Sequence, residues 1–255
     1  MKRFDPPAHA GRRALLIAPH QDDEALGCGG TLHLLAAAGA RVDVVIVARG
    51  DGGVDGGAGV EQREEESRRC CERLGTRPPA FLRVPSAELR EDPGAAAGRL
   101  REAVGGERPG LLFVPSPLER HDTHRATLLA ALCADVAAPD AAWWGWGVWD
   151  PIPAVEEAAE VDITEARSAK TLAIAAHASQ NRARALAAGM AARDMEQAVF
   201  ARLTGDEPRK AVERLLDLSA LGSQRPAPAT AADAAARCAA WLREHSERRV
   251  RSLWP

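Results

Sequence analysis

The chain carries the stretch LLIAPHQDDEALGCGGTL at residues 15–32, where an apolar strand turns into a helix. The apolar run ends at Pro19, and a histidine and three consecutive carboxylates follow before the helical pattern begins. Asp and Glu are favoured at a helix start, where they cap open amides and meet the positive end of the helix dipole. Helix capping is therefore one interpretation of this turn.

A divalent metal is the other interpretation, because capping does not need the histidine. Zinc is bound by imidazole nitrogen and carboxylate oxygen, and a catalytic zinc site keeps one position open for water. If Asp23 lies in the first turn of the helix, His20 and Asp23 can converge on one ion. Asp22 would then point elsewhere and be free to act on the water.

Strands and helices alternate along the first half of the chain. The patterns predict strands over 14–18, 42–47, 80–84 and 111–114, and helices over 24–38, 60–74, 95–104 and 125–137. This alternation is typical of a doubly wound, mainly parallel, Rossmann-like α/β sheet. In the common strand order 3-2-1-4-5 the first and fourth strands are neighbours, and ligands bind beyond their carboxyl ends. Residues after 18 should therefore face residues near 120.

Two histidines follow the fourth predicted strand, in ERHDTHRAT at residues 119–127. Two histidines in a loop are often ordinary polar residues at the protein surface. Opposite His20 and Asp23 across a switch point, however, they supply what a His/Asp/His zinc site still lacks. We expect His124, at the start of a helix, to be the third ligand and His121 to lie beside the metal.

Composition narrows the class of protein. The chain has 255 residues, 46% of them hydrophobic, and a net charge of -3, which favours neither nucleic acid nor a membrane surface as partner. No apolar run approaches the roughly 20 residues of a spanning helix, and no signal-type segment precedes the first strand, so we expect a cytoplasmic protein. Five cysteines fit no zinc or disulfide framework. A homo-oligomer is left open.

The second half of the chain is less regular. The glycine-rich residues 49–59 are interpreted as a flap. The segment WWGWGVW at residues 143–149 is interpreted as a strand leaving the core, whose tryptophans form either a sugar-stacking wall or ordinary core or interface packing. Helices are predicted over 162–176, 181–203, 208–222 and 230–250. The expected division is a domain over 1–205 and a helical C-terminal extension over 206–255, which packs on that domain or else forms a subunit contact or a pocket rim.

The two motifs together resemble those of the LmbE/PIG-L family of zinc-dependent N-deacetylases. That family carries (A/P)-H-P-D-D-E and H-P-D-H-R, and this chain has APHQDDE at 18–24 and HDTHR at 121–125. Further similarity runs through GGT at 29–31, Arg63 and Glu66, VDIT at 161–164 and the segment 170–180. The resemblance covers residues 12–203.

The resemblance implies a zinc hydrolase acting on an N-acetylated amino sugar or glycoconjugate, with these roles: Zn²⁺ ligands His20, Asp23 and His124; general base Asp22; acid and oxyanion partner His121; substrate contacts Arg63 and His177, with Gln180 weaker still. For His177, a packed histidine at a helix end is the alternative interpretation.

Two departures from the family pattern are visible. Gln21 replaces a proline, and Asp122-Thr123 replaces the family's Pro-Asp, which leaves the support of His121 in question. Two other functions therefore stay open: an amidase on another amino-sugar conjugate, such as a thiol conjugate, and a zinc- or sugar-binding protein without catalysis.

Overall fold

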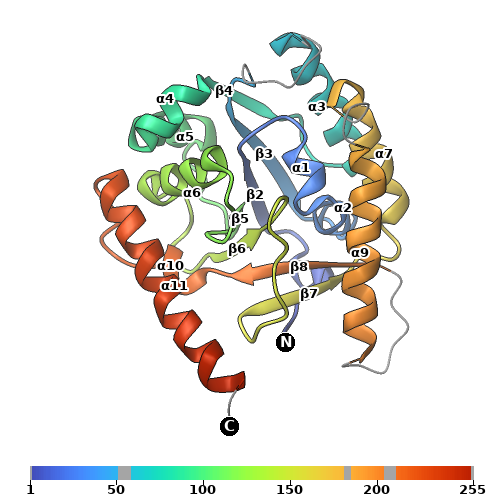
Figure 1. The fold of residues 1–255 in the computed structure, drawn as a ribbon. Helices are drawn as coiled ribbons and strands as arrows, with labels where there is room; N and C mark the ends of the chain where they lie inside the picture. Colours follow the sequence, from blue (N-terminus) through green and yellow to red (C-terminus); the bar gives the residue numbers. More distant parts are fainter. Residues whose placement is uncertain (1, 51–58, 181–184, 204–210, 254–255) are drawn as a thin grey trace.

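A computed structural model describes residues 2–50, 59–180, 185–203 and 211–253 of the protein (Figure 1). In this part of the chain one sheet runs in the order β1-β7-β8-β6-β5-β2-β3-β4. The strands are β1 (Lys2–Arg3), β2 (Arg13–Ala18), β3 (Arg41–Ala48), β4 (Ala80–Val84), β5 (Leu111–Pro115), β6 (Ala142–Trp146), β7 (Ala158–Asp162) and β8 (Val212–Asp217). Neighbouring strands are parallel except at β8, which is antiparallel to both β6 and β7.

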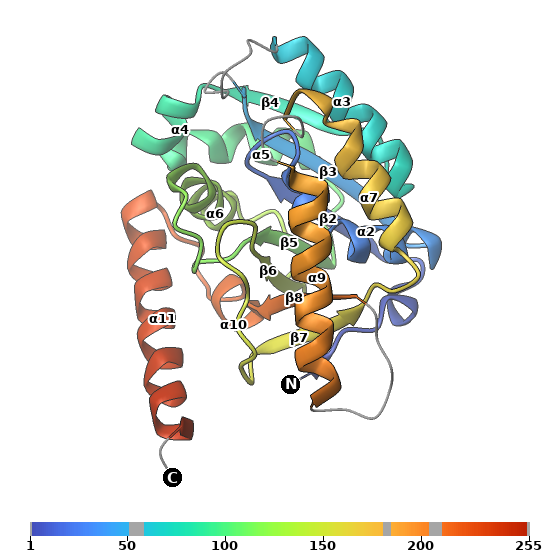
Figure 2. The same ribbon diagram turned by 45° about the vertical axis from the view of Figure 1, so that its right-hand side comes forward.

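Helices cover both faces of the sheet (Figures 1 and 2). They are α1 (Asp23–Leu26), α2 (Gly29–Ala37), α3 (Val60–Leu74), α4 (Ser86–Glu91), α5 (Ala96–Val104), α6 (Asp122–Ala134), α7 (Arg167–Ala176), α9 (Leu186–Leu203), α10 (Ser219–Gly222) and α11 (Ala231–Leu253), with short 3-10 turns at Pro6–His9 and Pro93–Ala95. The views place α2, α3, α7 and α9 on one side and α4, α5, α6 and α11 on the other.

The central strand β2 shows why both faces are covered. Leu15 and Ile17 lie in the apolar cluster shared with α5 and α6, whereas Leu16 and Ala18 lie in the cluster shared with α2, α3 and α7. All four side chains are fully buried. Successive strand side chains point to opposite faces, so an apolar run of this kind needs a helix layer on each side.

The predicted doubly wound fold is confirmed. β4, β3, β2, β5 and β6 lie in the order 3-2-1-4-5, so the strands before the two motifs are neighbours. The helix predicted over 24–38 is two helices, α1 and α2, separated at Gly27 and Cys28. A Cβ at Gly27 would lie 2.5 Å from Cε3 of Trp146, so the glycine lets α1 approach the sheet closely.

The helix predicted over 208–222 is wrong for residues 212–217, which form β8 in the sheet between β7 and β6. The apolar residues near 215–221 suggested a helical stripe, but the strand is buried along almost its whole length. Its charged residues Glu213 and Arg214 are buried with ion-pair partners, Lys170 and Glu160 respectively. A strand whose polar residues are buried shows no alternating pattern in the sequence.

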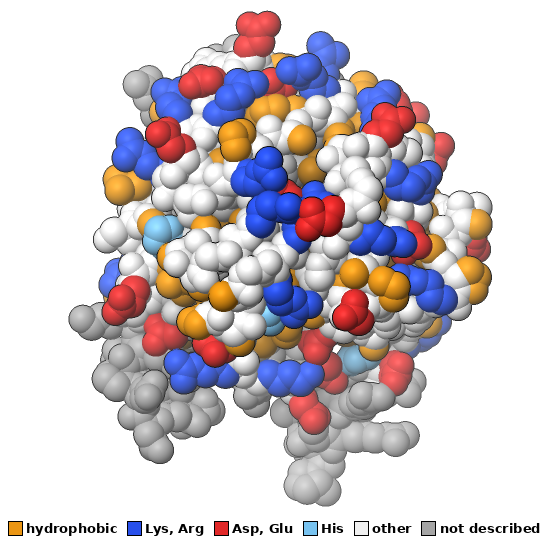
Figure 3. All heavy atoms as spheres, turned by 180° about the vertical axis from the view of Figure 1, so that it is seen from behind, with side chains coloured by type: hydrophobic (Ala, Val, Ile, Leu, Met, Phe, Trp, Pro, Cys, Tyr) orange, Lys and Arg blue, Asp and Glu red, His pale blue; other side chains and the backbone are white. Residues whose placement is uncertain are grey.

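Four further observations complete the fold. The tryptophan-rich segment does not leave the core, because β6 is paired with β5 and β8. Most of the predicted flap, residues 51–58, and residues 181–184 at the start of a predicted helix lie outside the described residues. Among described helices, none combines the length and apolar character that crossing a bilayer requires. On the rear face, Lys and Arg side chains are intermixed with Asp and Glu (Figure 3).

Candidate metal centre and pocket

The three predicted ligands converge where β2 and β5 end. His20 follows β2, Asp23 opens α1, and His124 lies in the first turn of α6. One ligand atom from each lies within 4.8 Å of the others. The Oδ2 atom of Asp23 lies 3.2 Å from Nδ1 of His20 and 3.3 Å from Nε2 of His124.

The chemistry and spacing of these atoms fit a zinc ion. Donors about 2.0–2.1 Å from a tetrahedral zinc are about 3.3 Å from one another, which matches both distances. Nε2 of His124 is buried and has no hydrogen-bond partner among the described residues. A buried imidazole nitrogen normally has a partner. One that faces a carboxylate and a second imidazole without a hydrogen bond is expected where a metal ion would bind.

The electrostatics of the ligands tie metal binding to proton release. Burial disfavours charge on His124, but ion pairing with Asp23, reinforced by Glu119, outweighs it and raises the pKa of the imidazole to about 10. Burial opposes ionisation of Asp23, yet the two histidines hold its pKa well below its usual value. His124 therefore carries a proton near neutral pH, and a metal must displace that proton to bind.

Asp22 occupies a strained turn beside the ligands. Its φ is 131° and its ψ -28°, a conformation that non-glycine residues rarely adopt. Its backbone N–H donates to Oε2 of Glu24 at 2.9 Å, which holds the turn. Burial, together with the nearby charge of Asp23, raises the pKa of the Asp22 carboxyl to about 7. The carboxyl lines the pocket next to the ligands and is not one of the three.

Two of the proposed ligands, His20 and Asp23, line a pocket of about 150 Å³, and His124 is fully buried beside them. His121 lines the pocket, with its ring centroid 5.2 Å from that of His20 and 4.8 Å from that of His124. Burial and then the two neighbouring histidines lower the pKa of His121, so its neutral form prevails near pH 7. Its Nδ1 atom has no hydrogen-bond partner in the described part of the chain.

The altered second motif explains that missing partner. Asp122 is exposed in the first turn of α6, whereas Thr123 is buried and lines the pocket. The Oγ1 atom of Thr123 is also without a hydrogen-bond partner among the described residues. Neither side chain bonds to the His121 ring in this structure, so the brace that the family pattern implies is absent from the described contacts.

The two predicted substrate residues lie in different places. Arg63 lines the pocket, and its Nη1 and Nη2 atoms donate to the backbone carbonyls of Gly50 and Gln21, each at 3.1 Å. His177 is fully buried behind the turn, with Nε2 3.0 Å from Oε1 of Glu24, and does not line the pocket. Gln180, three residues further on, does line it.

A second group of metal-type side chains, Glu24, Cys70 and His177, also lies within 4.8 Å. Burial raises the pKa of the Cys70 thiol well above its ordinary value, so the thiol stays protonated and is a poor ligand. Glu24 and His177 are already paired with each other. The first group is therefore the better candidate for a metal.

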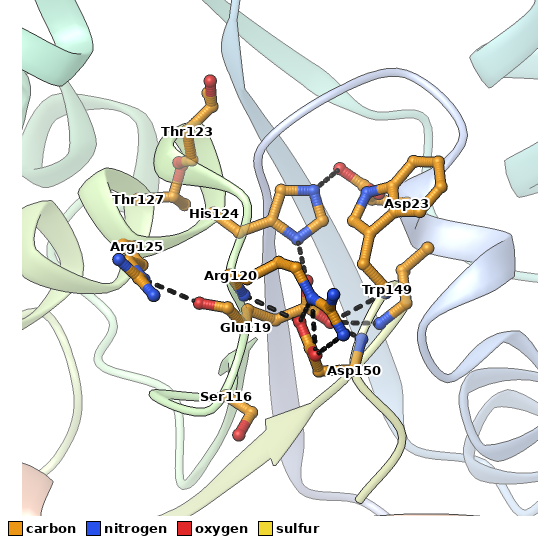
Figure 4. Close-up of polar contacts among 12 residues, drawn as sticks. Asp23, Ser116, Glu119, Arg120, Thr123, His124, Arg125, Thr127, Trp149 and Asp150 are labelled. Carbon is orange, nitrogen blue, oxygen red and sulfur yellow. Dashed lines mark hydrogen bonds and ion pairs between the residues drawn. The ribbon is translucent and has the colours of Figure 1, made fainter.

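Sequence reasoning missed Glu119. It is fully buried between β5 and α6, with Oε2 3.1 Å from Nδ1 of His124 (Figure 4). Its other oxygen accepts the backbone N–H groups of residues 148–150. The only signal in the sequence is a carboxylate two residues before the first histidine of the second motif, a position that no periodicity marks.

The fold and the site together define a doubly wound α/β protein with a two-histidine, one-carboxylate centre at its switch point. Residues 15–134 match the family model described as PIG-L, GlcNAc-PI de-N-acetylase. Over this segment, a little under half of its length, the chain is similar to the PIG-L (LmbE-like) family, in agreement with the resemblance seen in its motifs.

Two individual proteins to which the chain is similar are named as deacetylases. Over 134 residues the chain is 32% identical to the diacetylchitobiose deacetylase of Thermococcus kodakarensis, covering 48% of this chain and 49% of that protein. The chain thus spans about half the length of this relative. The N,N'-diacetylchitobiose deacetylase of Pyrococcus horikoshii superposes with a TM-score of 0.63 at 21% identity, covering 83% of this chain and 87% of that one.

A hydratase shares the same architecture. GalB, the 4-carboxy-2-hydroxymuconate hydratase of Pseudomonas putida, superposes with a TM-score of 0.61 at 19% identity, covering 81% of this chain and 96% of that one. At such identities the likeness shows the fold alone. The reaction must therefore be argued from the site of this chain.

Proposed function

We propose that the protein is a zinc-dependent N-deacetylase that hydrolyses the acetamide of a 2-acetamido sugar or glycoconjugate. The observation that carries this proposal is the convergence of His20, Asp23 and His124, two of which line a pocket that Asp22 also lines. The relatives named as deacetylases support the class of reaction. The cytoplasmic location stays a prediction, and a homo-oligomer stays open.

His20, Asp23 and His124 would hold the zinc ion, and their donor atoms suit it. When bound, zinc polarises an amide carbonyl and lowers the pKa of a water molecule toward about 7. The remaining work falls to groups that line the pocket.

Asp22 is the general base of the proposed reaction. A base works best when its pKa lies near the operating pH, and the pKa of Asp22 is raised to about 7. Its carboxylate accepts the proton of the attacking water and can return it to the departing amine. The strained turn keeps this carboxylate at the pocket rather than in the ligand set.

His121 and Arg63 line the same pocket and complete the proposed machinery. A neutral imidazole keeps one N–H donor, so His121 can still donate to the carbonyl oxygen as negative charge develops there. The lowered pKa of His121 favours this role over that of a proton donor at neutral pH. Arg63, already bound to two backbone carbonyls, presents a fixed edge to a sugar hydroxyl.

One observation favours a second candidate, a zinc- or sugar-binding protein without catalysis. Nδ1 of His121 and Oγ1 of Thr123 lack hydrogen-bond partners in the described part of the chain, so the imidazole is less firmly oriented than a carboxylate partner would make it. A loosely held His121 would still permit metal and sugar binding.

Metal analysis and acetate release separate the candidates. The purified protein should contain one zinc per chain and release acetate from at least one member of a panel of N-acetylglucosamine compounds: free, nucleotide-linked and lipid- or aglycone-linked. Mass spectrometry of the products then identifies the bond that is cut, including the amide of a thiol conjugate.

Variants test the roles. Asp22→Asn should bind zinc as the wild type does and lose nearly all acetate release, whereas His20→Ala should lose both. Asp122→Asn, at an exposed carboxylate in the second motif, is the matched control and should change neither. Zinc without release from any amide would favour the binding protein, and full release by Asp22→Asn would contradict the assignment of the base.

A further inference from the structure

Glu119 is a fully buried carboxylate that the proposed mechanism does not use. It lies on the loop between β5 and α6, two residues before His121. Its two oxygens face different groups, one toward the metal ligand His124 and one toward the loop after β6 (Figure 4). A buried carboxylate is costly unless each oxygen is satisfied, so both contacts need an account.

The first oxygen, Oε2, faces the side of His124 that is turned away from the metal centre. It lies 3.1 Å from Nδ1, and neither atom has a hydrogen-bond partner of its own among the described residues. Nε2, on the opposite side of the ring, points to Asp23 at 3.3 Å. If Nδ1 carries the proton and donates it to Glu119, the lone pair of Nε2 is free for the metal.

The second oxygen, Oε1, holds a backbone turn. It accepts the N–H groups of Trp149 at 3.0 Å, of Asp150 at 3.3 Å and, more closely, of Val148. Three successive amides around one oxygen form a concave anion site of the kind that fixes a loop. The turn is tight, because a Cβ at Gly147 would lie 2.2 Å from the carbonyl oxygen of Asp150.

The turn that Oε1 holds is a wall of the pocket. Val148 and Trp149 both line it. Trp149 is 45% exposed, and its ring lies nearly parallel to that of His121, with 16° between their planes and 6.4 Å between their centroids. Arg120 ties the same turn from outside, since its Nη2 lies 2.7 Å from Oδ1 of Asp150.

From these contacts we infer that Glu119 is a positioning residue that serves both halves of the site. One carboxylate oxygen orients His124 so that Nε2 is presented to the metal, and the other holds the pocket wall at Val148 and Trp149. This inference rests on the proposed function for its metal, because it assigns Glu119 to the support of that centre. The exposed indole, fixed at the mouth of the pocket, offers a flat face to the apolar side of a sugar ring.

Glutamine at position 119 separates the two roles. The carboxamide keeps one oxygen, which can still accept the amides of residues 148–150. Its nitrogen then faces Nδ1 of His124 as a donor, and Nδ1 must become the acceptor. The ring proton moves to Nε2, where it blocks the metal. Alanine removes both contacts at once.

Two measurements that need no substrate test the inference on the full-length protein. Zinc affinity is measured by competition with a chromophoric chelator, and order in the turn by hydrogen exchange at residues 148–150. Glu119→Gln should weaken zinc binding 10- to 100-fold, the usual cost of losing a carboxylate behind a ligating histidine, and keep exchange in the turn slow. Glu119→Ala should weaken zinc binding similarly and speed up exchange.

Glu160→Gln is the matched control, because Glu160 is a buried glutamate on β7 paired with Arg214 at 3.3 Å. It should leave zinc affinity and exchange at residues 148–150 unchanged. Wild-type zinc affinity in Glu119→Gln overturns the inference, as does slow exchange in a folded Glu119→Ala. If the alanine variant fails to fold, the near-isosteric glutamine variant still decides the metal role. A protein that binds zinc but releases no acetate would refute the proposed function and leave these measurements valid.

Discussion

The ionised carboxylate of Asp22, which the proposed reaction needs as its base, should lower the stability of the folded protein. The Asp22 carboxyl is buried beside Asp23, and its pKa is raised from an ordinary 3.8 to about 7. The ionised carboxylate is therefore less favourable in the folded than in the unfolded state, and the stability of the metal-free protein falls as pH rises through that window. Asp22→Asn keeps the shape of the side chain without the charge, and asparagine tolerates a positive φ.

The size of the effect follows from the pKa change. At about 1.4 kcal/mol per pH unit, the interval from 3.8 to about 7 corresponds to up to about 4 kcal/mol above pH 7. For a chain of this size each kcal/mol changes Tm by roughly 2–4 °C, so the variant should melt up to roughly 8–16 °C higher at pH 8. The difference should shrink as pH falls toward the ordinary pKa of 3.8, and it should vanish only well below that value, where the carboxyl is protonated in both states.

Thermal unfolding after removal of metal by a chelator measures this directly. Wild type, Asp22→Asn and the exposed control Asp122→Asn are melted at pH values from 4 to 8. The gain should appear only in Asp22→Asn and grow with pH, while the same variant loses acetate release. Equal Tm values for wild type and Asp22→Asn at pH 8 would refute the view that this carboxylate is strained by burial and by its neighbour.

Three further outcomes are expected. Trp149→Ala should raise KM several-fold with little change in kcat, and Trp149→Phe should restore most of the affinity. An unchanged KM for a substrate that the protein cleaves would mean that the indole does not contact that substrate. Glu213→Gln should cost about 3 kcal/mol in urea unfolding at pH 7, since it takes a charge partner from buried Lys170. Because pairing lowers the pKa of Glu213, that cost should shrink as pH falls below its ordinary 4.5. Gly27→Ala should lower stability by about 1–3 kcal/mol, measured the same way, because its Cβ would meet Trp146 at 2.5 Å.

The sequence predicted the part of the fold that follows from local patterns. The alternation of apolar strands and amphipathic helices predicted the order of the sheet. That order in turn predicted that residues near 20 lie close to residues near 124. Gly75, at a φ of +74°, ends α3 where the pattern ended. In each case one short segment contains the whole signal: a periodicity, a glycine or a run of carboxylates.

The features that escaped prediction depend on contacts between distant segments. Glu119 acts on amides about thirty residues further along, a relation that the loop around it does not encode. The leucines of β8 also suit a helical stripe, and the partners that make its charged residues tolerable in a sheet, among them Lys170 and Glu160, lie on other elements. Local reasoning counts such burial as unfavourable because it cannot see the partner.

The position of β8 has a consequence for how the chain is made. Among the described strands, β8 links β7 to β6 and the strands beyond it, because β8 pairs with β6 on one side and with β7 on the other. On the ribosome, residues 142–162 emerge well before residues 212–217. The edges of β6 and β7 that pair with β8 therefore stay unpaired until β8 has been synthesised. Open edges of this kind recruit other chains. A nascent chain stalled near residue 205 would therefore be a target for chaperones or aggregation, whereas the completed chain closes the gap itself.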